Sequence, residues 1–154
     1  MRLSLSSISA NNSSVSKELW SCNCKPRILT VDDTPFNVVA MGILLKEYWK
    51  IEQESAVNGE IAVNMFKEAC QKECGCPNRA YRIIFMDIQM PIMDGKIASA
   101  KIIELKNEGP PVDTSIIAVT AYSSEDNVKE CKEIGMKEVL EKPVNFELLE
   151  EIMG

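Results

Sequence analysis

The sequence predicts a single α/β domain in which a parallel sheet lies between two layers of helices. Short apolar runs rich in β-branched residues alternate along the chain with longer segments of helical period. These runs are apolar on both faces, which is typical of parallel strands covered by helices on each side. With 154 residues the chain is long enough for one domain with a substantial core and short for two. We therefore expect one doubly wound domain with right-handed crossovers.

Strands and helices are expected to alternate after an N-terminal leader. Residues 1–25 are rich in Ser and Asn without apolar periodicity, so we expect a disordered or weakly ordered leader before a domain covering 26–154. The expected strands are residues 27–31, 51–57, 82–86, 115–119 and 138–141. The expected helices are residues 35–49, 59–72, 95–107 and 124–134, with a last one from about 145.

Local signals mark where these elements begin and end. Thr34 followed by Pro35 suits the N-cap and first turn of the first helix, and the later Asn58 and Gly135 are turn signals. The second strand, within IEQESAV, has a weaker pattern than the others. Residues 70–81 lengthen the connection before the third strand, and we expect a surface loop there.

Composition and charge exclude several classes of function. The net charge is −6 and the pI is about 4.8, without a cluster of basic residues, so nucleic-acid binding is not expected. No apolar run approaches the length of a membrane span, so we expect no membrane contact and a cytoplasmic location. The chain has no histidine, which removes the commonest general base and the commonest zinc ligand.

Five of the six cysteines fall in two local groups. One group is Cys22 with Cys24, and the other is Cys70 with Cys74 and Cys76. The start of the chain lacks the apolar segment of a secretory signal, which favours a cytosolic protein with reduced thiols over a disulfide framework. A metal site is the alternative, but C-x-C and C-x-x-x-C-x-C differ from the usual C-x-x-C pairs. We therefore expect free thiols in a tail and a loop.

Polar residues follow the apolar strands at the point where each strand ends. In an open parallel sheet, ligands bind outside the carboxyl ends of the strands, where these side chains meet. The residues so placed are Asp32 and Asp33 after the first strand, Asp87 after the third, Thr120 after the fourth and Lys142 after the fifth.

Three carboxylates at one edge of the sheet predict a bound cation. Without one, they would repel each other and raise one another's pKa values. Oxygen ligands without His or Cys suit a hard ion, and the small number of carboxylates favours Mg²⁺ over Ca²⁺. For Asp32 and Asp33 taken alone, an interaction with the dipole of the following helix is the alternative.

The same edge predicts phosphoryl transfer to a carboxylate. Asp87 can act as a nucleophile that forms an acyl phosphate when Mg²⁺ neutralises the developing charge. Lys142 offers a cation and Thr120 a hydroxyl for phosphate oxygens. Taken singly, Thr120 more often caps a helix and Lys142 is more often a solvated amine, so the prediction rests on the whole set.

Read in order, these motifs resemble a known family. They are TVDD at 30–33, IIFMDIQMPIMDG at 83–95, IIAVTA at 116–121 and VLEKPVN at 139–145. From about 27 to 153 the chain resembles the receiver domain of two-component response regulators. The stretch ILTVDDTPFN is most similar to receivers attached to hybrid histidine kinases.

The resemblance implies a fold, a phosphoacceptor and a metal site. The fold is a flavodoxin-like (βα)5 sandwich with strand order 2-1-3-4-5. The implied phosphoacceptor is Asp87. The implied ligands of Mg²⁺ are Asp32 or Asp33, Asp87, and the backbone carbonyl of Gln89.

The resemblance also implies contacts with the phosphoryl group and a switch surface. The contacts come from the Lys142 side chain, the Thr120 hydroxyl and the Ala121 backbone, with a cis peptide bond between Lys142 and Pro143. Phosphorylation is implied to repack the surface around the fourth strand, the fourth helix and the fifth strand, which partners then recognise. Val139 replaces the aromatic residue that the family often has there, and Tyr122 is the candidate to cover part of that surface.

The function expected from these observations is phosphorelay signalling. Because the chain has no histidine, the phosphohistidine donor must be a histidine kinase or histidine phosphotransfer protein, or another region of a hybrid kinase parent. We expect the domain to catalyse its own phosphorylation from such a donor, with autodephosphorylation left open, and not to be a kinase itself. The sequence ends after the fifth helix without a DNA-binding domain, which favours a stand-alone relay or a fragment of a hybrid kinase.

Three alternatives remain at the sequence level. An aspartyl-nucleophile phosphohydrolase usually has a second Asp two residues after the nucleophile, where this chain has Gln89. A flavodoxin-like module for FMN predicts a phosphate loop after the first strand, where this chain has DDTPFN. A degenerate receiver that acts only as a scaffold is disfavoured because all five site positions are intact.

Overall fold

A five-stranded parallel sheet forms the centre of the computed structural model, which describes residues 22–154. The strand order is β2-β1-β3-β4-β5, which confirms the predicted doubly wound fold. The strands are β1 (Ile28–Val31), β2 (Glu54–Ala56), β3 (Ile83–Asp87), β4 (Ser115–Thr120) and β5 (Glu138–Glu141). The helices are α3 (Pro35–Trp49), α4 (Gly59–Cys70), α5 (Gly95–Glu108), α6 (Glu125–Ile134) and α7 (Phe146–Met153). Of the predicted leader, residues 1–25, the part over residues 1–21 lies outside the described part of the chain.

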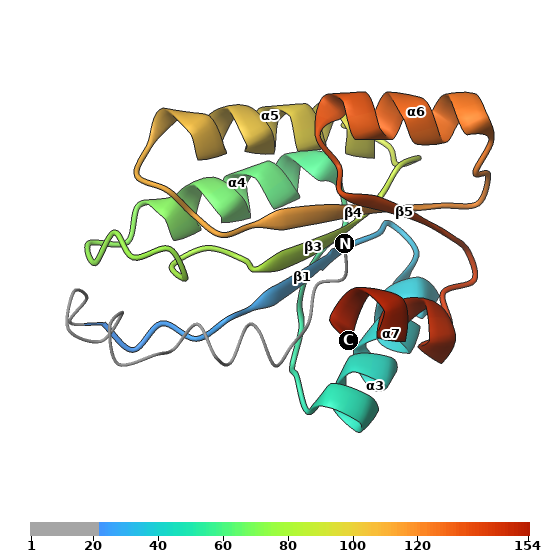
Figure 1. Ribbon diagram of the computed structural model, residues 1–154, viewed down its shortest axis with the longest axis horizontal. Helices are drawn as coiled ribbons and strands as arrows, with labels where there is room; N and C mark the ends of the chain where they lie inside the picture. Colours follow the sequence, from blue (N-terminus) through green and yellow to red (C-terminus); the bar gives the residue numbers. More distant parts are fainter. Residues whose placement is uncertain (1–21) are drawn as a thin grey trace.

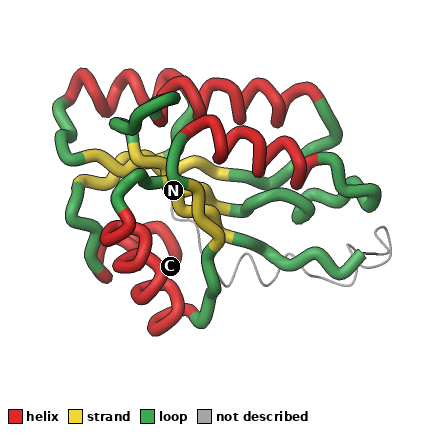
Figure 2. Tube along the Cα trace, turned by 180° about the vertical axis from the view of Figure 1, so that it is seen from behind, coloured by secondary structure: helices red, strands yellow, loops and turns green. Residues whose placement is uncertain are grey.

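The helices cover the two faces of the sheet unequally. Figure 1 shows α4, α5 and α6 on one face and α3 with α7 on the other, and Figure 2 shows the same layers from behind. One apolar cluster lies under the first set of helices and includes Phe66, Met86 and Ile102. A second cluster lies under α3 and α7 and includes Leu45 and Leu149. The three central strands are therefore buried on both faces, as their largely apolar sequences predict.

The register of the strands determines which residues meet at the carboxyl edge of the sheet. Val31 pairs with Met86, so that the next residue of each strand, Asp32 and Asp87, lie side by side. Asp87 pairs with Val119, and Thr120 pairs with Glu141 one residue before Lys142. The ends of β1, β3, β4 and β5 thus deliver their polar residues to a single place.

Side-chain caps begin four of the five helices found in residues 22–154. Asn58, Asp94, Ser124 and Asn145 each accept a hydrogen bond from a backbone N–H in the first turn of the helix that follows. Thr34 occupies the N-cap position of α3 as predicted, but its side chain makes no capping hydrogen bond. The Thr34 backbone N–H instead donates to the carboxylate of Asp32 at 2.9 Å.

The connection between α4 and β3 is only partly the surface loop that the sequence predicts. Its first residues are exposed, whereas Cys76, Arg79 and Tyr81 are all buried. The Arg79 guanidinium is 2% exposed and donates five hydrogen bonds, all to backbone carbonyls. The polar sequence of this loop does not predict the burial, because the acceptors of the arginine include Pro110 and Pro111 in the segment after α5.

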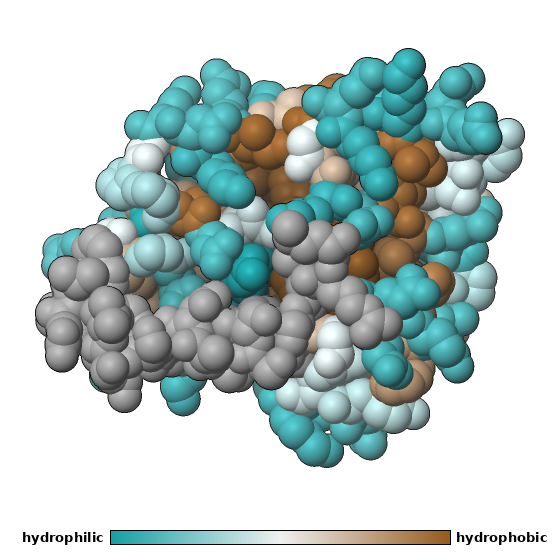
Figure 3. All heavy atoms as spheres, in the orientation of Figure 1, coloured by the Kyte–Doolittle hydropathy of each residue, from teal (hydrophilic) through white to brown (hydrophobic). Residues whose placement is uncertain are grey.

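The face of the molecule seen in Figure 3 carries many polar side chains. Figure 3 shows hydrophilic residues over the outer sides of α5 and α6, with apolar residues visible between these helices. The hydrophobic stripe of α6 faces inward, where Cys131 is buried. None of the helices formed by residues 22–154 combines the length and apolarity required to cross a bilayer.

Candidate functional site

Three carboxylates meet at the carboxyl edge of the sheet. Asp32, Asp33 and Asp87 can each place a carboxylate oxygen within 4.8 Å of the other two. Asp32 and Asp87 are 5% and 4% exposed, whereas Asp33 faces solvent. The cluster is therefore buried at Asp32 and Asp87 and open to solvent at Asp33.

Lys142 is the cation that the structure provides to this cluster. Its Nζ lies 3.1 Å from a carboxylate oxygen of Asp32 and 3.1 Å from one of Asp87. Burial lowers the pKa of Lys142, but the hydrogen bonds to the two aspartates outweigh it and raise the pKa above its usual value. The peptide bond between Lys142 and Pro143 is cis. A charged amine thus bridges the ends of β1 and β3.

The charge of Asp87 remains incompletely compensated despite this lysine. Burial is the main cause that raises the pKa of Asp87, to about 6, and the neighbouring Asp32 adds to it. Lys142 acts in the opposite direction without cancelling these effects. Three carboxylates and one ammonium leave an excess of negative charge at a partly buried site, which a divalent cation would balance.

Asp32 is held in place by contacts that the sequence analysis missed. One carboxylate oxygen accepts the Thr34 N–H at 2.9 Å, and the other accepts the Asn37 side-chain amide at 3.2 Å. Asn37 lies in the first turn of α3, five residues after Asp32. The motif DDTPFN contained the signal, because a helix that begins three residues after an aspartate brings its first turn back toward that side chain.

Thr120 ends β4 next to this cluster, and it does not cap the following helix. Its hydroxyl donates to the Tyr122 carbonyl and accepts from the Tyr122 N–H, both at 3.1 Å. Ser124 caps α6 instead. The Thr120 hydroxyl is therefore placed at the sheet edge by a short turn, and its proton must leave the Tyr122 carbonyl before it can be donated to another acceptor.

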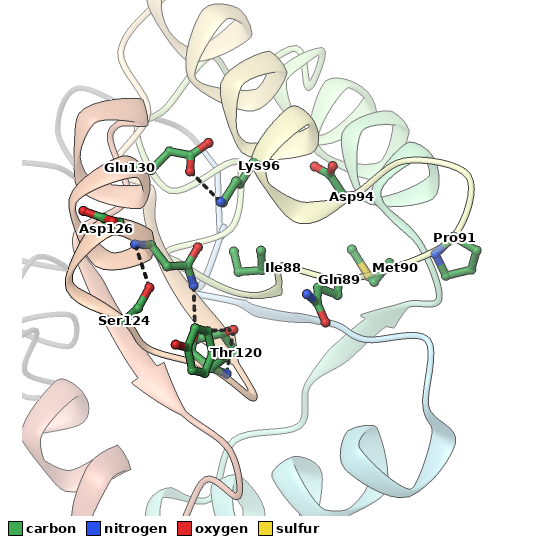
Figure 4. Close-up of a pocket in the computed structure, with 12 residues that line it drawn as sticks. Ile88, Gln89, Met90, Pro91, Asp94, Lys96, Thr120, Ser124, Asp126 and Glu130 are labelled. Carbon is green, nitrogen blue, oxygen red and sulfur yellow. Dashed lines mark hydrogen bonds and ion pairs between the residues drawn. The ribbon is translucent and has the colours of Figure 1, made fainter.

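The other predicted residues line two separate hollows. Gln89 and Tyr122 line a cavity of about 770 Å³ between the β3–α5 loop and α6, shown in Figure 4. Val139 and Lys142 line a second cavity of about 710 Å³ beside β5 and α7. Tyr122 is 71% exposed, and Ala121 before it is also exposed. Tyr122 and Val139 therefore lie at different hollows.

The donor set fits a hard divalent cation. It consists of carboxylate oxygens close enough to share one ion, and the excess negative charge at Asp87 favours such an ion. The bridging lysine and the strand-end hydroxyl suit the oxygens of a phosphoryl group. The fold and site together define a class of doubly wound domains equipped for phosphate chemistry on a carboxylate.

The chain belongs to the response regulator receiver domain family, whose model matches residues 28–153. Over 127 residues it is 32% identical to the osmosensing histidine protein kinase SLN1 of Saccharomyces cerevisiae, covering 82% of this chain and 10% of the relative. The chain thus spans about a tenth of the length of the curated relatives it matches.

Solved structures support the same assignment. The receiver domain of the histidine kinase CKI1 from Arabidopsis thaliana, complexed with Mg²⁺, has a TM-score of 0.68 at 32% identity, covering 78% of this chain and 85% of that one. The co-crystal structure of the Saccharomyces cerevisiae phosphotransfer protein Ypd1 with the receiver domain of Ssk1 has a TM-score of 0.68 at 28% identity. That match covers 82% of this chain and 84% of the other.

The geometry also bears on the hydrolase alternative. Gln89 occupies the position of the second acid, and its side chain is exposed. The next acidic residue of this loop, Asp94, is engaged in capping α5 through the Ile97 N–H at 2.9 Å. The Gln89 amide has no acidic proton to give, and the Asp94 carboxylate is committed to the cap of α5. Neither residue is therefore placed to protonate a leaving group, which disfavours a phosphohydrolase.

Proposed function

We propose that Asp87 accepts a phosphoryl group from a phosphohistidine in a Mg²⁺-dependent reaction. The observation that carries this proposal is the geometry of one carboxylate. Asp87 is 4% exposed, its pKa is raised, and Lys142 bridges it to Asp32 at 3.1 Å from each. A buried carboxylate with an excess of negative neighbours gains stabilisation from a cation and can present its oxygen to an incoming phosphorus atom.

The transfer forms one bond and breaks another. A carboxylate oxygen of Asp87 forms the new P–O bond while the P–N bond to the donor histidine breaks, and the imidazole leaves with the electron pair. Lys142 neutralises charge on the phosphoryl oxygens, and Thr120 and the Ala121 N–H approach from the end of β4. Asp32, fixed by the Thr34 N–H and Asn37, keeps Lys142 pointed at Asp87.

Mg²⁺ would be held by Asp32, Asp33 and Asp87, with the Gln89 carbonyl as a further ligand. When bound, it would neutralise negative charge that develops on the transferred group. The Arabidopsis receiver complexed with Mg²⁺ supports this assignment.

The donor is a histidine kinase or a histidine phosphotransfer protein, and it belongs either to another protein or to another region of a hybrid kinase parent. The yeast complex of Ypd1 with a receiver supports this choice, and so does the similarity to hybrid kinases. We place the reaction in the cytoplasm. Phosphorylation would change the surface around β4, α6 and β5 that partners recognise, through Thr120 and the turn that contains Tyr122.

The test is to incubate the domain with Mg²⁺ and acetyl phosphate and to measure intact mass. The expected result is one phosphoryl adduct per chain that is stable in acid and labile in base. Asp87→Asn should give no adduct, while the matched variant Asp126→Asn, an exposed aspartate at the start of α6, should react like the parent. An unmodified parent, or equal labelling of Asp87→Asn, would contradict the proposal.

A further inference from the structure

A second cluster of ligating side chains lies away from the phosphoacceptor. The Sγ atoms of Cys22, Cys24, Cys74 and Cys76 all lie within 4.8 Å of one another. The Cys24 and Cys74 sulfurs are 3.7 Å apart, and those of Cys74 and Cys76 are 3.6 Å apart. All four are free thiols. Two C-x-C pairs separated by about fifty residues in the chain thus form one group of four sulfurs.

The spacing of these sulfurs matches a tetrahedral zinc site. With Zn–S bonds of about 2.3 Å, neighbouring sulfurs of a tetrahedron are about 3.8 Å apart. The two separations of 3.6 and 3.7 Å are close to this edge length. A disulfide requires sulfurs about 2.05 Å apart, so the cluster as built is not arranged for covalent pairing.

The surrounding structure holds the loop part of the cluster in place. The buried Arg79 guanidinium donates to the carbonyls of Gly75 at 3.0 Å and Cys76 at 2.9 Å. It also reaches the Pro110 carbonyl at 2.7 Å, which ties this loop to the segment after α5. These contacts fix the backbone that carries Cys74 and Cys76 before any metal arrives.

A buried positive charge lies against the loop that carries Cys74 and Cys76. All five hydrogen-bond acceptors of Arg79 are neutral carbonyls, so its buried positive charge has no carboxylate partner among them. Four thiolates around one Zn²⁺ carry a net negative charge that would offset it.

The cluster lies at the opposite edge of the sheet from Asp87. Cys22 and Cys24 precede β1, and Cys74 and Cys76 precede β3, so both pairs lie at the amino ends of parallel strands. Figure 1 shows these two segments on the same side of the molecule, and Figure 2 agrees from behind. A metal there would connect the chain before β1 to the α4–β3 loop without entering the phosphoacceptor site.

We propose that Cys22, Cys24, Cys74 and Cys76 bind one Zn²⁺ as a structural tetrathiolate site. Four protein ligands fill the tetrahedral shell and leave no open position, so the site is not catalytic. On binding, each sulfur forms a Zn–S bond with its lone pair, and every thiol that was protonated releases its proton to solvent. No oxidant or reductant takes part.

The first test is metal content after expression with Zn²⁺ under reducing conditions and exhaustive dialysis without chelator. The domain should retain one equivalent of zinc, and the double variant Cys24→Ser, Cys76→Ser should lose it. Two variants serve as controls that should keep their zinc. Cys70→Ser removes a thiol of the same region outside the cluster, and Asp87→Asn disrupts the acidic site. Zinc lost from Asp87→Asn and retained by the double cysteine variant would overturn the proposal.

The second measurement uses the unmutated domain, so it stands even if a cysteine variant fails to fold. Zinc K-edge absorption should report four sulfur neighbours at about 2.3 Å and no oxygen or nitrogen neighbour. A shell of oxygen ligands would contradict the site. A metal-free protein whose intact mass is lower by two hydrogens per oxidised cysteine pair would show disulfides instead and would equally overturn it.

Discussion

Asp87 illustrates, at the scale of one residue, a functional group that costs the fold stability. Burial and Asp32 raise its pKa to about 6, above the ordinary aspartate value of about 3.9. Lys142 reduces the loss of stability caused by the buried Asp87 charge, because its ammonium group bridges the two aspartates. The residue is therefore suited to its proposed reaction, but it lowers the stability of the metal-free domain, in which its charge is poorly compensated.

Substituting Asp87 should stabilise the metal-free domain at neutral pH. Because the folded domain holds this proton more tightly than the unfolded chain, the stability that it contributes is present below about pH 3.9 and is lost as the pH rises through about 6. At pH 7.5 without Mg²⁺, Asp87→Asn should therefore raise the free energy of unfolding by about 1–2 kcal/mol. Urea unfolding followed by circular dichroism measures this difference.

The pH and metal dependence provide the controls for this prediction. The difference in the free energy of unfolding between the parent and Asp87→Asn should narrow as the pH falls from 7.5 toward 4. Added Mg²⁺ should stabilise only the parent. Metal-free buffers are best prepared without a chelator, which would also remove zinc from the cysteine cluster. The expected repulsion between the Asp87 and Asp32 carboxylates would be disproved if Asp87→Asn were less stable than the parent at pH 7.5 and the difference in stability did not change with pH.

At the scale of elements, the start of α5 lies against the end of β3. The Gly95 N–H donates to the Ile88 carbonyl at 2.8 Å, and Asp94 caps the helix. A Cβ atom at Gly95 would overlap the carbonyl oxygen of Asp87 and come within 2.9 Å of the Ile88 Cα. Glycine here allows the helix to approach the backbone of Asp87 directly.

Gly95→Ala should therefore destabilise the domain by about 2–4 kcal/mol, because rigid backbone must move to admit the methyl group. The matched control is Gly109→Ala at the other end of α5, where an added Cβ meets no atom within 4 Å. Thermal unfolding of both variants against the parent measures the difference. Equal melting temperatures for the two variants would contradict the close approach of Gly95 to the backbone of Asp87 and Ile88.

At the scale of the whole molecule, an exposed apolar face lies beside the acidic site. Phe36, Val39 and Ile43 are 78%, 59% and 57% exposed, and their spacing puts them on one side of α3. Asn37 of the same helix contacts Asp32. We expect this face to be where a phosphotransfer protein docks, because a donor there would bring its phosphohistidine close to Asp87.

Replacing both Phe36 and Val39 with Ala should slow phosphotransfer from a phosphorylated histidine phosphotransfer protein by about tenfold or more. Labelling by acetyl phosphate should be unchanged, because a small donor does not need the docking face. Ile97→Ala is the control, since Ile97 is also half exposed but lies on α5 across the sheet. Equal slowing with both donors would point to damage at the site and not to docking.

The fold could be predicted because each element contains its own signal. β3 is five buried residues in a row, Asn58 and Asp94 mark helix starts, and Gly135 ends α6 with a φ of 118°. In a parallel sheet, polar residues that follow such strands are directed to one edge, so the meeting of Asp32, Asp87 and Lys142 was also predictable.

Other features depended on packing between distant segments. The burial of Arg79 could not be inferred from a polar loop, because its acceptors are carbonyls up to 32 residues away. The Thr120 hydroxyl bonds within its own turn, whereas the sequence alone allowed a helix cap.

The sequence by itself determined the alternation of strands and helices, the doubly wound class and the edge at which the acidic residues gather. Local hydrophobic period and the direction of parallel strands are sufficient for each of these. Only the tertiary structure decided that two C-x-C pairs, which look like unrelated thiols in a tail and a loop, meet as one group of four sulfurs. Their proximity follows from the pairing of β1 with β3, which brings the segments before both strands to the same end of the sheet.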